Sequence, residues 1–313
     1  MFKTDKMKLT ELIKILHCLN CGKPELNISD DSKKIVCKNC QQTYNLENGV
    51  PVFIALNDYE KELQSDLHKS HDSAFKYVDH YQKDGVEHDY FQDRGSGTEH
   101  GERRVREYIF SNINKKTGRI LDVGCGRAWV ARELCPKNYE VVSMDISLDN
   151  TTKAIEKYRF ENHSAVVADV YSLPFNKNVF DYIIASEIIE HVVDPATFVK
   201  NLIHILKPGG TLIVTTPYKE KIRYTLCVHC NKPTPIHAHL HSFDEKKLTT
   251  IYKDKEIKSC EYYTFGNKIP IHLRMHVFLK YLNFWSWKKI DQFLNLLYNV
   301  PFRILVKWEK SSS

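Results

Sequence analysis

The sequence predicts an α/β protein built on a doubly wound parallel sheet, with a small cysteine-rich ribbon before it and helices after it. Two observations carry this prediction. The apolar run 120–123 ends in Gly124 and Gly126, and a segment that can form a helix follows, which is the outline of a strand, a tight nucleotide-binding turn and a helix. Beyond this turn, apolar runs alternate with amphipathic segments up to residue 217, as expected for parallel strands joined by helices.

Length and composition fit this architecture. The chain has 313 residues, of which 42% are hydrophobic, enough for a core domain of about 150 to 200 residues with attachments. A net charge of +6 permits a nucleic-acid or anionic-lipid partner without requiring one. Because the sequence shows neither a secretory signal nor an apolar run long enough to span a membrane, we expect a cytoplasmic protein.

Two Cys-x-x-Cys pairs near the N-terminus predict a structural zinc site. Fifteen residues separate Cys18 and Cys21 from Cys37 and Cys40. Each pair can point two thiolates at one ion, and two pairs complete a tetrahedral site with no open position. The chain has nine cysteines, an odd number, and these pairs favour metal ligation over disulfides. The sequence therefore predicts a zinc ribbon over residues 1–57.

Acidic residues follow the predicted strands at positions suited to a nucleoside. The strand 139–144 ends in Asp145, about twenty residues beyond the glycines, where a carboxylate can accept hydrogen bonds from both hydroxyls of a ribose. Ile146, beside it, can pack on a purine. The next strand ends in Asp169 and Val170, where a carboxylate can accept a hydrogen bond from an adenine amino group.

Together these motifs resemble those of the class I S-adenosylmethionine-dependent methyltransferases. The matching residues are Ile120-Leu121-Asp122-Val123-Gly124-Cys125-Gly126, Asp145, Ala168-Asp169, Phe180-Asp181 and Leu206-Lys207-Pro208-Gly209-Gly210. The resemblance spans residues 113–217 and implies a seven-stranded, Rossmann-like sheet. It also implies that Asp122 and Gly124 face the methionine part of the cofactor. The implied cofactor-binding residues are Asp122, Gly124, Cys125, Gly126, Asp145, Ile146, Asp169, Val170 and Ser186.

Two further features bear on this resemblance. The stretch from Leu16 to Phe53 resembles the small zinc-ribbon proteins that partner and stabilise tRNA and release-factor methyltransferases, here fused to the front of the domain. In addition, Ala128 and Trp129 stand where many class I members have a third glycine. Because a pyrophosphate needs an open, glycine-rich helix start, this departure weakens a nicotinamide oxidoreductase interpretation more than a methyltransferase one.

Glu187, Glu190 and His191 follow the fourth predicted strand at positions i, i+3 and i+4, so a helix would place them on one face. Carboxylates and imidazole suit a divalent ion that can acidify an acceptor hydroxyl. The Glu-x-x-Glu-His pattern resembles that of ubiquinone-pathway O-methyltransferases and of terminal-ribose methyltransferases of small RNAs. Three interpretations stay open: a metal site, His191 as a base without metal, and a structural role.

A second group of cysteines and histidines lies in the insertion 222–243. Cys227 and Cys230 form a third Cys-x-x-Cys pair, and three histidines alternate after it, so they would share one face of an extended chain. Two thiolates and two imidazoles would make an S2N2 zinc site. Which histidine ligates stays open, since one of them could instead join the Glu-x-x-Glu-His group. The three candidates are His237, His239 and His241.

The segments on either side of the domain are predicted to be helical. Residues 58–112 form a linker or lid, with a helix over 102–113. Residues 276–313 form amphipathic helices that either contact a membrane surface peripherally or pack on the core as a cap or dimer surface. Pro301 interrupts this segment, and its cations are Lys280, Lys288, Lys289, Arg303 and Lys307. The candidate lid residues are Tyr81, Tyr90, Phe91, Arg94 and His100.

The sequence therefore predicts an S-adenosylmethionine-dependent methyltransferase domain over residues 113–275. The acceptor is expected to be methylated on oxygen and to be a small molecule, a sugar- or lipid-linked precursor, or a terminal nucleotide. The alternative is a non-catalytic zinc-binding adaptor on the same fold, although decayed enzymes usually lose the glycines and acids that stand here. The oligomeric state does not follow from the sequence. The candidate catalytic residues are His191, Glu187 and Glu190.

Overall fold

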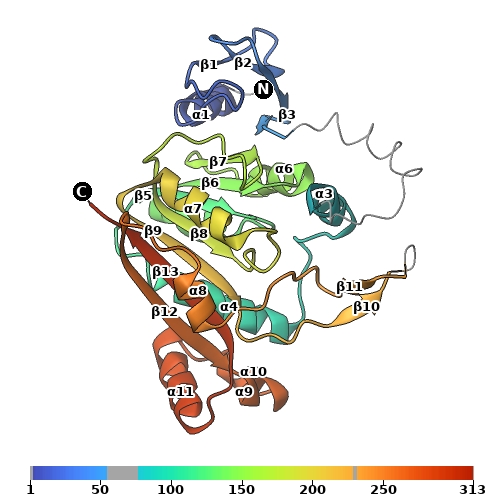
Figure 1. Ribbon diagram of the computed structural model, residues 1–313, viewed down its shortest axis with the longest axis vertical. Helices are drawn as coiled ribbons and strands as arrows, with labels where there is room; N and C mark the ends of the chain where they lie inside the picture. The colour runs from blue at the N-terminus through green and yellow to red at the C-terminus, as the bar shows by residue number, and fades with distance from the viewer. Residues whose placement is uncertain (1–2, 55–76, 228–230, 313) are drawn as a thin grey trace. The chain divides into compact units, whose positions relative to one another are not determined.

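The computed structural model describes residues 3–54, 77–227 and 231–312 (Figure 1). The chain divides into two compact units. Unit 1 comprises Met1–Phe91, Lys116–Ile183 and Asn201–Lys207, and unit 2 comprises Gln92–Lys115, Ile184–Lys200 and Pro208–Ser313. Three elements belong in part to each unit: β8 (Phe180–Ser186), α7 (Pro195–Ile205) and β9 (Leu206–Pro217).

Unit 1 contains the cysteine-rich N-terminal segment and the first strands of the α/β domain. Its helices are α1 (Lys3–Ile13), α3 (Tyr77–Glu87), α5 (Trp129–Leu134), the 3-10 helix η1 (Cys135–Lys137) and α6 (Leu148–Lys157). Its strands are β1 (Leu26–Ile28), β2 (Lys34–Cys37), β3 (Thr43–Glu47), β4 (Val50–Val52), β5 (Gly118–Val123), β6 (Tyr139–Asp145) and β7 (His163–Val167). They are ordered β1-β2-β3-β4-β7-β6-β5, followed by β8.

The parallel strands of unit 1 form where the sequence predicts them. In β6, Val141 pairs with Ile120 of β5 on one side and with His163 of β7 on the other. Both faces of these strands are buried, which explains their nearly continuous apolar runs. Helix α6 packs on β6 and β7 (Figure 1). Ser147 caps its N-terminus, because its side chain accepts a hydrogen bond from the backbone N–H of Asn150.

The N-terminal segment extends the sheet instead of forming a separate ribbon. Its last strand, β4, runs parallel to β7 with Val52 beside Val167, and the Phe53 N–H donates to the Val167 carbonyl at 2.9 Å. The expected count of seven strands is therefore wrong, because the described residues alone form a sheet of eleven strands. The physical reason is that β7 would otherwise end the sheet with unpaired backbone groups, and that Val50 and Val52 bury apolar surface against Ala165 and Val167.

Unit 2 contains the second half of the α/β domain and an attached helical segment. Its sheet strands follow the order β8-β9-β13-β12, with β13 antiparallel to both neighbours. A separate hairpin joins β10 (Tyr224–Leu226) to β11 (Pro233–Pro235). The other elements are α4 (Ser96–Phe110), α8 (Glu245–Thr250), β12 (Ile257–Asn267), α9 (Lys268–His272), α10 (His276–Leu279), α11 (Phe284–Leu297) and β13 (Pro301–Lys310). No described helix has the length and apolar content needed to cross a membrane.

The expectation of helices over the whole of 276–313 is wrong for its last part. Helices α10 and α11 do form, but Pro301–Lys310 is strand β13. Ile304, Leu305 and Val306 are fully buried and lie between β9 and β12. A short apolar run buried on both faces has no periodicity that separates strand from helix, so the sequence could not decide. Pro301 is tolerated because it is the first residue of the strand.

His163 is expected to make folding sensitive to acid. Its ring is buried, with Nε2 2.9 Å from Ser143 Oγ and Nδ1 2.8 Å from the Tyr158 carbonyl oxygen. Burial lowers the pKa of His163 from 6.5 to about 4. As the pH falls, His163 is therefore protonated first in the unfolded chain, where its pKa has the ordinary value of about 6.5. The stability that depends on the neutral ring is complete above that pH and is lost progressively as the pH falls toward 4.

Urea unfolding of the full chain, measured from about pH 7 to about pH 5, checks this prediction. The free energy of unfolding should fall by up to about 1.4 kcal/mol per pH unit on account of His163. A His163→Gln variant keeps a polar side chain that does not titrate, so its stability should depend less on pH. An equal slope in both proteins would show that His163 does not control the acid sensitivity.

Candidate functional site

The predicted glycine turn is present at the end of β5. Gly124 and Gly126 have φ angles of +64° and +43°, in the left-handed region that glycine adopts without strain. The Cys125 N–H donates to the Met144 carbonyl at 3.0 Å, which ties the turn to β6. Ala128, in the position of the third glycine, is also left-handed, with φ of +49°, and caps helix α5.

Two buried carboxylates face this turn. Asp122 is 2% exposed, and its Oδ2 atom has no hydrogen-bond partner among the described residues. Burial raises the pKa of Asp122 well above its usual range, and the charge of Asp145 raises it further. The Asp145 carboxylate has more hydrogen-bond partners, since its two oxygens accept hydrogen bonds from the backbone N–H groups of Gly126 at 3.0 Å and Ser147 at 2.9 Å. The unpaired Asp122 oxygen marks a place where a ligand could donate a hydrogen bond.

Helix α3 contacts the predicted nucleoside positions, which sequence reasoning missed. The Tyr77 hydroxyl donates to Asp169 Oδ2, and the Gln82 amide donates to the Ile146 carbonyl. Helix α3 also lies close to Ser147, because a Cβ atom added at Gly85 of this helix would be only 2.1 Å from Ser147 Oγ. No local pattern in the sequence marks these contacts.

The candidate lid residues have varied contacts. The Tyr90 hydroxyl donates to Asp84, and a Cβ atom added at Gly126 would lie 3.7 Å from the Tyr90 ring. The Lys157 ammonium lies 5.0 Å from the centre of the Phe91 ring. In unit 2, Arg94 pairs with Glu102 at 2.8 Å. Tyr81 lies in α3, and His100 lies in α4.

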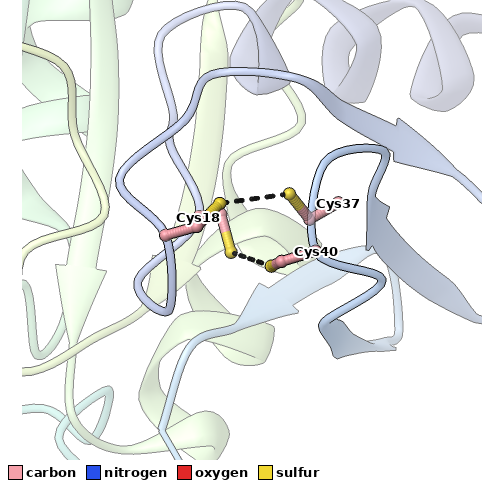
Figure 2. A group of neighbouring side chains, drawn as sticks. Cys18, Cys37 and Cys40 are labelled. Carbon is pink, nitrogen blue, oxygen red and sulfur yellow. Dashed lines mark hydrogen bonds between the residues drawn. The ribbon is translucent and has the colours of Figure 1, made fainter.

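The four N-terminal cysteines converge as predicted (Figure 2). Cys18 and Cys40 sulfurs are 3.6 Å apart, as are those of Cys21 and Cys37. Tetrahedral zinc with bonds of about 2.3 Å holds its sulfurs about 3.8 Å apart, whereas a disulfide needs about 2 Å. The sulfur positions therefore fit a zinc ion.

Each N-terminal Cys-x-x-Cys pair forms the same backbone loop, which we call a knuckle. In the first, the Cys18 N–H donates to the Lys23 carbonyl and the Gly22 N–H donates back to the Cys18 carbonyl. In the second, Cys37 makes the equivalent bonds with Gln42 and Gln41. Gly22 and Gln41 both have positive φ, at 69° and 61°. This loop turns both thiols of a pair toward one point.

The third Cys-x-x-Cys pair has the same hydrogen bonds in the part that the structure describes. The Cys227 N–H donates to the Lys232 carbonyl at 3.0 Å, and the Asn231 N–H donates to the Cys227 carbonyl at 2.9 Å. Asn231 also has a positive φ, of 54°. Cys230 lies outside the described residues, so the S2N2 zinc site stays a prediction. Of its histidine candidates, His237 is exposed and His241 Nε2 lies 2.9 Å from the Val192 carbonyl oxygen.

The Glu-x-x-Glu-His group lies on a turn, so the expected helix is wrong there. Glu187 has a φ of +59°, which ends β8, and the His191 N–H bonds back to the Ile188 carbonyl. The chain turns because the Glu187 N–H donates to the Thr215 carbonyl of β9 at 2.9 Å instead of starting a helix. Glu187 forms an ion pair with Arg303 at 2.9 Å.

Glu190, His191 and His239 form a second cluster that could hold a metal ion, with ligand atoms within 4.8 Å of one another. Glu190 is 1% exposed. Its Oε2 accepts the Thr216 hydroxyl at 2.9 Å, and its Oε1 has no hydrogen-bond partner in the described part of the chain. Burial raises the pKa of Glu190 well above its usual range, and the charge of Glu187 raises it further. A buried carboxylate with a free oxygen beside two imidazoles fits a divalent cation.

Polar contacts orient both imidazoles. His191 Nδ1 lies 3.3 Å from the Ala238 carbonyl oxygen, and His239 Nδ1 lies against the Glu220 carboxylate. In metal sites such a partner on one ring nitrogen fixes the ring and leaves the other nitrogen for the ion. The Leu240 N–H donates to the Glu190 carbonyl at 2.7 Å, which ties the histidine segment to the turn. Sequence reasoning missed Glu220, Thr216 and Arg303, although two polar threonines ending the apolar strand β9 were a usable signal.

Comparison with known proteins identifies relatives of the chain. It is 31% identical over 129 residues to the ubiquinone biosynthesis O-methyltransferase of Rickettsia akari, covering 38% of this chain and 51% of the relative. It is 31% identical over 121 residues to the mitochondrial ubiquinone biosynthesis O-methyltransferase of Homo sapiens, covering 34% of this chain and 31% of the relative. The chain thus spans about half or less of the length of these curated relatives.

A solved structure and a family model also match the chain. Haemonchus contortus phosphoethanolamine N-methyltransferase 2 in complex with S-adenosyl-L-methionine aligns with a TM-score of 0.48 and 16% identity, over 76% of this chain and 58% of that one. Residues 98–255, just over half of the chain, match the family model described as a methyltransferase domain. The chain therefore belongs to the methyltransferase domain family, and its α/β domain is of the class I, S-adenosylmethionine-dependent kind.

Proposed function

We propose that this protein transfers the methyl group of S-adenosylmethionine to a hydroxyl oxygen of a small-molecule acceptor, and that a divalent ion binds at Glu190, His191 and His239. The observation that carries the proposal is the buried Glu190 carboxylate, which has one oxygen without a hydrogen-bond partner in the described chain and lies beside two oriented imidazoles. Oxygen as the acceptor atom is supported by the names of the relatives, which are O-methyltransferases.

The residues of unit 1 would hold the cofactor. Asp122 Oδ2 would accept a hydrogen bond from the ammonium of the methionine part, and the absence of side chains at Gly124 and Gly126 lets the backbone approach it. Asp145 and Asp169 would accept hydrogen bonds from the ribose and the adenine, in exchange for the Gly126 N–H and the Tyr77 hydroxyl. When bound, the cofactor supplies a methyl group activated by its positively charged sulfur.

The Glu190, His191 and His239 cluster would prepare the acceptor. As the acceptor oxygen bonds to the methyl carbon, the carbon–sulfur bond breaks, the bonding electrons stay on sulfur to give S-adenosylhomocysteine, and the hydroxyl proton passes to solvent water. A divalent ion, when bound, supplies the Lewis acidity that lowers the pKa of that hydroxyl. Glu190, His191 and His239 would hold the ion, and Glu220 would orient His239. Holding the reacting atoms at near-attack distance accounts for much of the remaining acceleration.

We also propose that the N-terminal cluster binds zinc for a structural purpose. Four thiolates complete a tetrahedral site, so no position stays open for a substrate. The resemblance of this segment to methyltransferase-activating zinc ribbons supports the same role, as does its attachment to the sheet through β4. The knuckle bonds around Cys227 support a further zinc ion in the insertion 222–243.

A methyl-transfer assay on the full chain tests the catalytic proposal. The acceptor panel contains aromatic and aliphatic alcohols, sugars, and RNA with a free terminal ribose, and the measured product is S-adenosylhomocysteine. We expect turnover on a small hydroxyl compound that a chelator abolishes and added magnesium, manganese or zinc restores. Transfer to amines or thiols alone would contradict oxygen as the acceptor atom. Chelator-resistant turnover would instead favour His191 as a base without metal, and cofactor binding without any turnover would favour the adaptor.

A further inference from the structure

Exposed apolar side chains are concentrated in one part of unit 2. Twelve of the nineteen large hydrophobic side chains that are exposed among the described residues lie between 271 and 300. They belong to the segment α9–α11 (Lys268–Val300), a group of short helices at the end of the β12–β13 hairpin (Figure 1). Phe278, Tyr281 and Leu296 are 75%, 78% and 82% exposed. Such a concentration of exposed apolar side chains in one segment indicates a binding surface.

Three exposed apolar side chains of α11 and one lysine lie on one face of the helix. Trp285, Lys289, Phe293 and Leu296 are exposed and follow one another at spacings of four, four and three residues. The opposite face carries Trp287, which is buried and packs edge to face on Tyr108 of α4 and beneath the Arg104 guanidinium. Helix α11 is thus anchored from inside and leaves its outer apolar face uncovered.

Backbone contacts hold α10 in place against the same helix α4. The Arg103 guanidinium donates to the carbonyls of Lys280 and Leu282, and the Arg104 guanidinium donates to those of Leu279 and Leu282. Phe278 and Tyr281 are therefore presented from a fixed backbone. A preformed surface of this kind loses little conformational entropy when it binds.

The net charge of the described segment Lys268–Val300 is positive, and its acidic residue is buried. It carries five cationic residues: Lys268, Arg274, Lys280, Lys288 and Lys289. Its single acidic residue, Asp291, is 4% exposed and accepts the backbone N–H groups of Gly266 and Asn267 at 3.0 Å and 2.7 Å. The surface thus combines apolar side chains with uncompensated positive charge.

We propose that the α9–α11 segment binds to the surface of an anionic lipid bilayer, with its apolar side chains at the boundary between headgroups and acyl chains. Tryptophan and tyrosine prefer this depth, and lysines can reach from it to the lipid phosphates. No described helix could cross a membrane, so the contact is interfacial. A second copy of the chain fits less well, because pairing the same surface on itself would bring like charges together. This inference does not depend on the methyl acceptor.

Vesicle co-sedimentation of the full chain tests this inference. Vesicles of equal parts phosphatidylcholine and phosphatidylglycerol should bind the protein, and vesicles of phosphatidylcholine alone should bind it much less. Phe278→Ser with Leu296→Ser should weaken binding about a hundredfold, since burying each side chain contributes about a factor of ten. Lys280→Gln with Lys289→Gln should weaken binding about thirtyfold and reduce its dependence on salt.

Matched controls separate this surface from general hydrophobicity and net charge. Val86→Ser removes a side chain that is 69% exposed in α3, and Lys253→Gln with Lys255→Gln removes two exposed charges elsewhere in unit 2. Both controls should bind as the wild type does. Absence of wild-type binding to anionic vesicles would overturn the proposal. So would a dimer in solution that Phe278→Ser with Leu296→Ser dissociates, because the surface would then be an interface between two copies.

Discussion

A Glu190→Gln variant is expected to lose about a thousandfold in methyl transfer without losing folding stability. Glutamine has the same shape and can still accept the Thr216 hydroxyl, which lies 2.9 Å from Glu190 Oε2. It lacks the negative charge that favours a divalent ion, and losing a Lewis acid removes several kcal/mol of transition-state stabilisation. Folding stability should not fall, because burying the Glu190 carboxylate is itself unfavourable: one of its oxygens has no hydrogen-bond partner among the residues that the structure describes.

Bound metal and single-turnover rate, measured together, check this prediction. Glu190→Gln should lose one equivalent of metal per chain while the N-terminal zinc stays bound. The matched control is Glu220→Gln, which contacts His239 and would not touch the ion. This control should weaken metal binding by about 10- to 100-fold, and excess metal should restore its rate. Unchanged metal content and rate in Glu190→Gln would show that this carboxylate is not a ligand.

The features that the sequence predicted well have local signals. The turn at Gly124 and Gly126 needs left-handed φ angles, and glycine supplies them. Strands β5, β6 and β8 are buried on both faces, so each appears as an apolar run of ordinary strand length. The two N-terminal knuckles follow from the Cys-x-x-Cys spacing itself. In each case a few neighbouring residues determine the backbone.

The features that the sequence did not predict depend on contacts between residues that are far apart in the chain. Nothing near Val52 indicates that it pairs with Val167, more than a hundred residues later. Tyr77 and Asp169 are similarly remote, and no spacing rule links them. Glu187 was grouped with Glu190 and His191 by helical spacing, yet its left-handed φ breaks that spacing and Arg303 pairs with it. His239 was one of several candidates until the folded chain brought it to Glu190 and His191.

A Cys37→Ser variant is expected to destabilise unit 1 as a whole and not only its first residues. The N-terminal segment has about fifty residues, too few to bury a core that supports folding without a metal or another staple. Tyr44 ties the core of the segment to the cysteines, because its side chain is buried and its hydroxyl lies 3.1 Å from Cys18 Sγ. Because metal binding in such segments is linked to folding, losing one thiolate should remove several kcal/mol of stability.

The loss should spread because β4 of this segment pairs with β7. When β4 detaches, β7 becomes an edge strand, and the apolar contacts of Val50 and Val52 are exposed. Cys37→Ser should therefore lower the melting temperature of unit 1 by about 10 °C or more. It should also increase hydrogen exchange at the Phe53 N–H, which donates to the Val167 carbonyl, while β5 and β6 stay protected.

Replacing a cysteine outside the clusters tests whether the destabilisation comes from the loss of zinc. Cys260 of β12 is a free, half-buried thiol in unit 2, and Cys260→Ser should keep both the zinc content and the melting temperature. Cys37→Ser should release one zinc equivalent, and a chelator should reproduce its exchange pattern in the wild type. If Cys37→Ser kept its zinc and its melting temperature, the four sulfurs would be close only through packing. Their 3.6 Å separations would then carry no information about a metal.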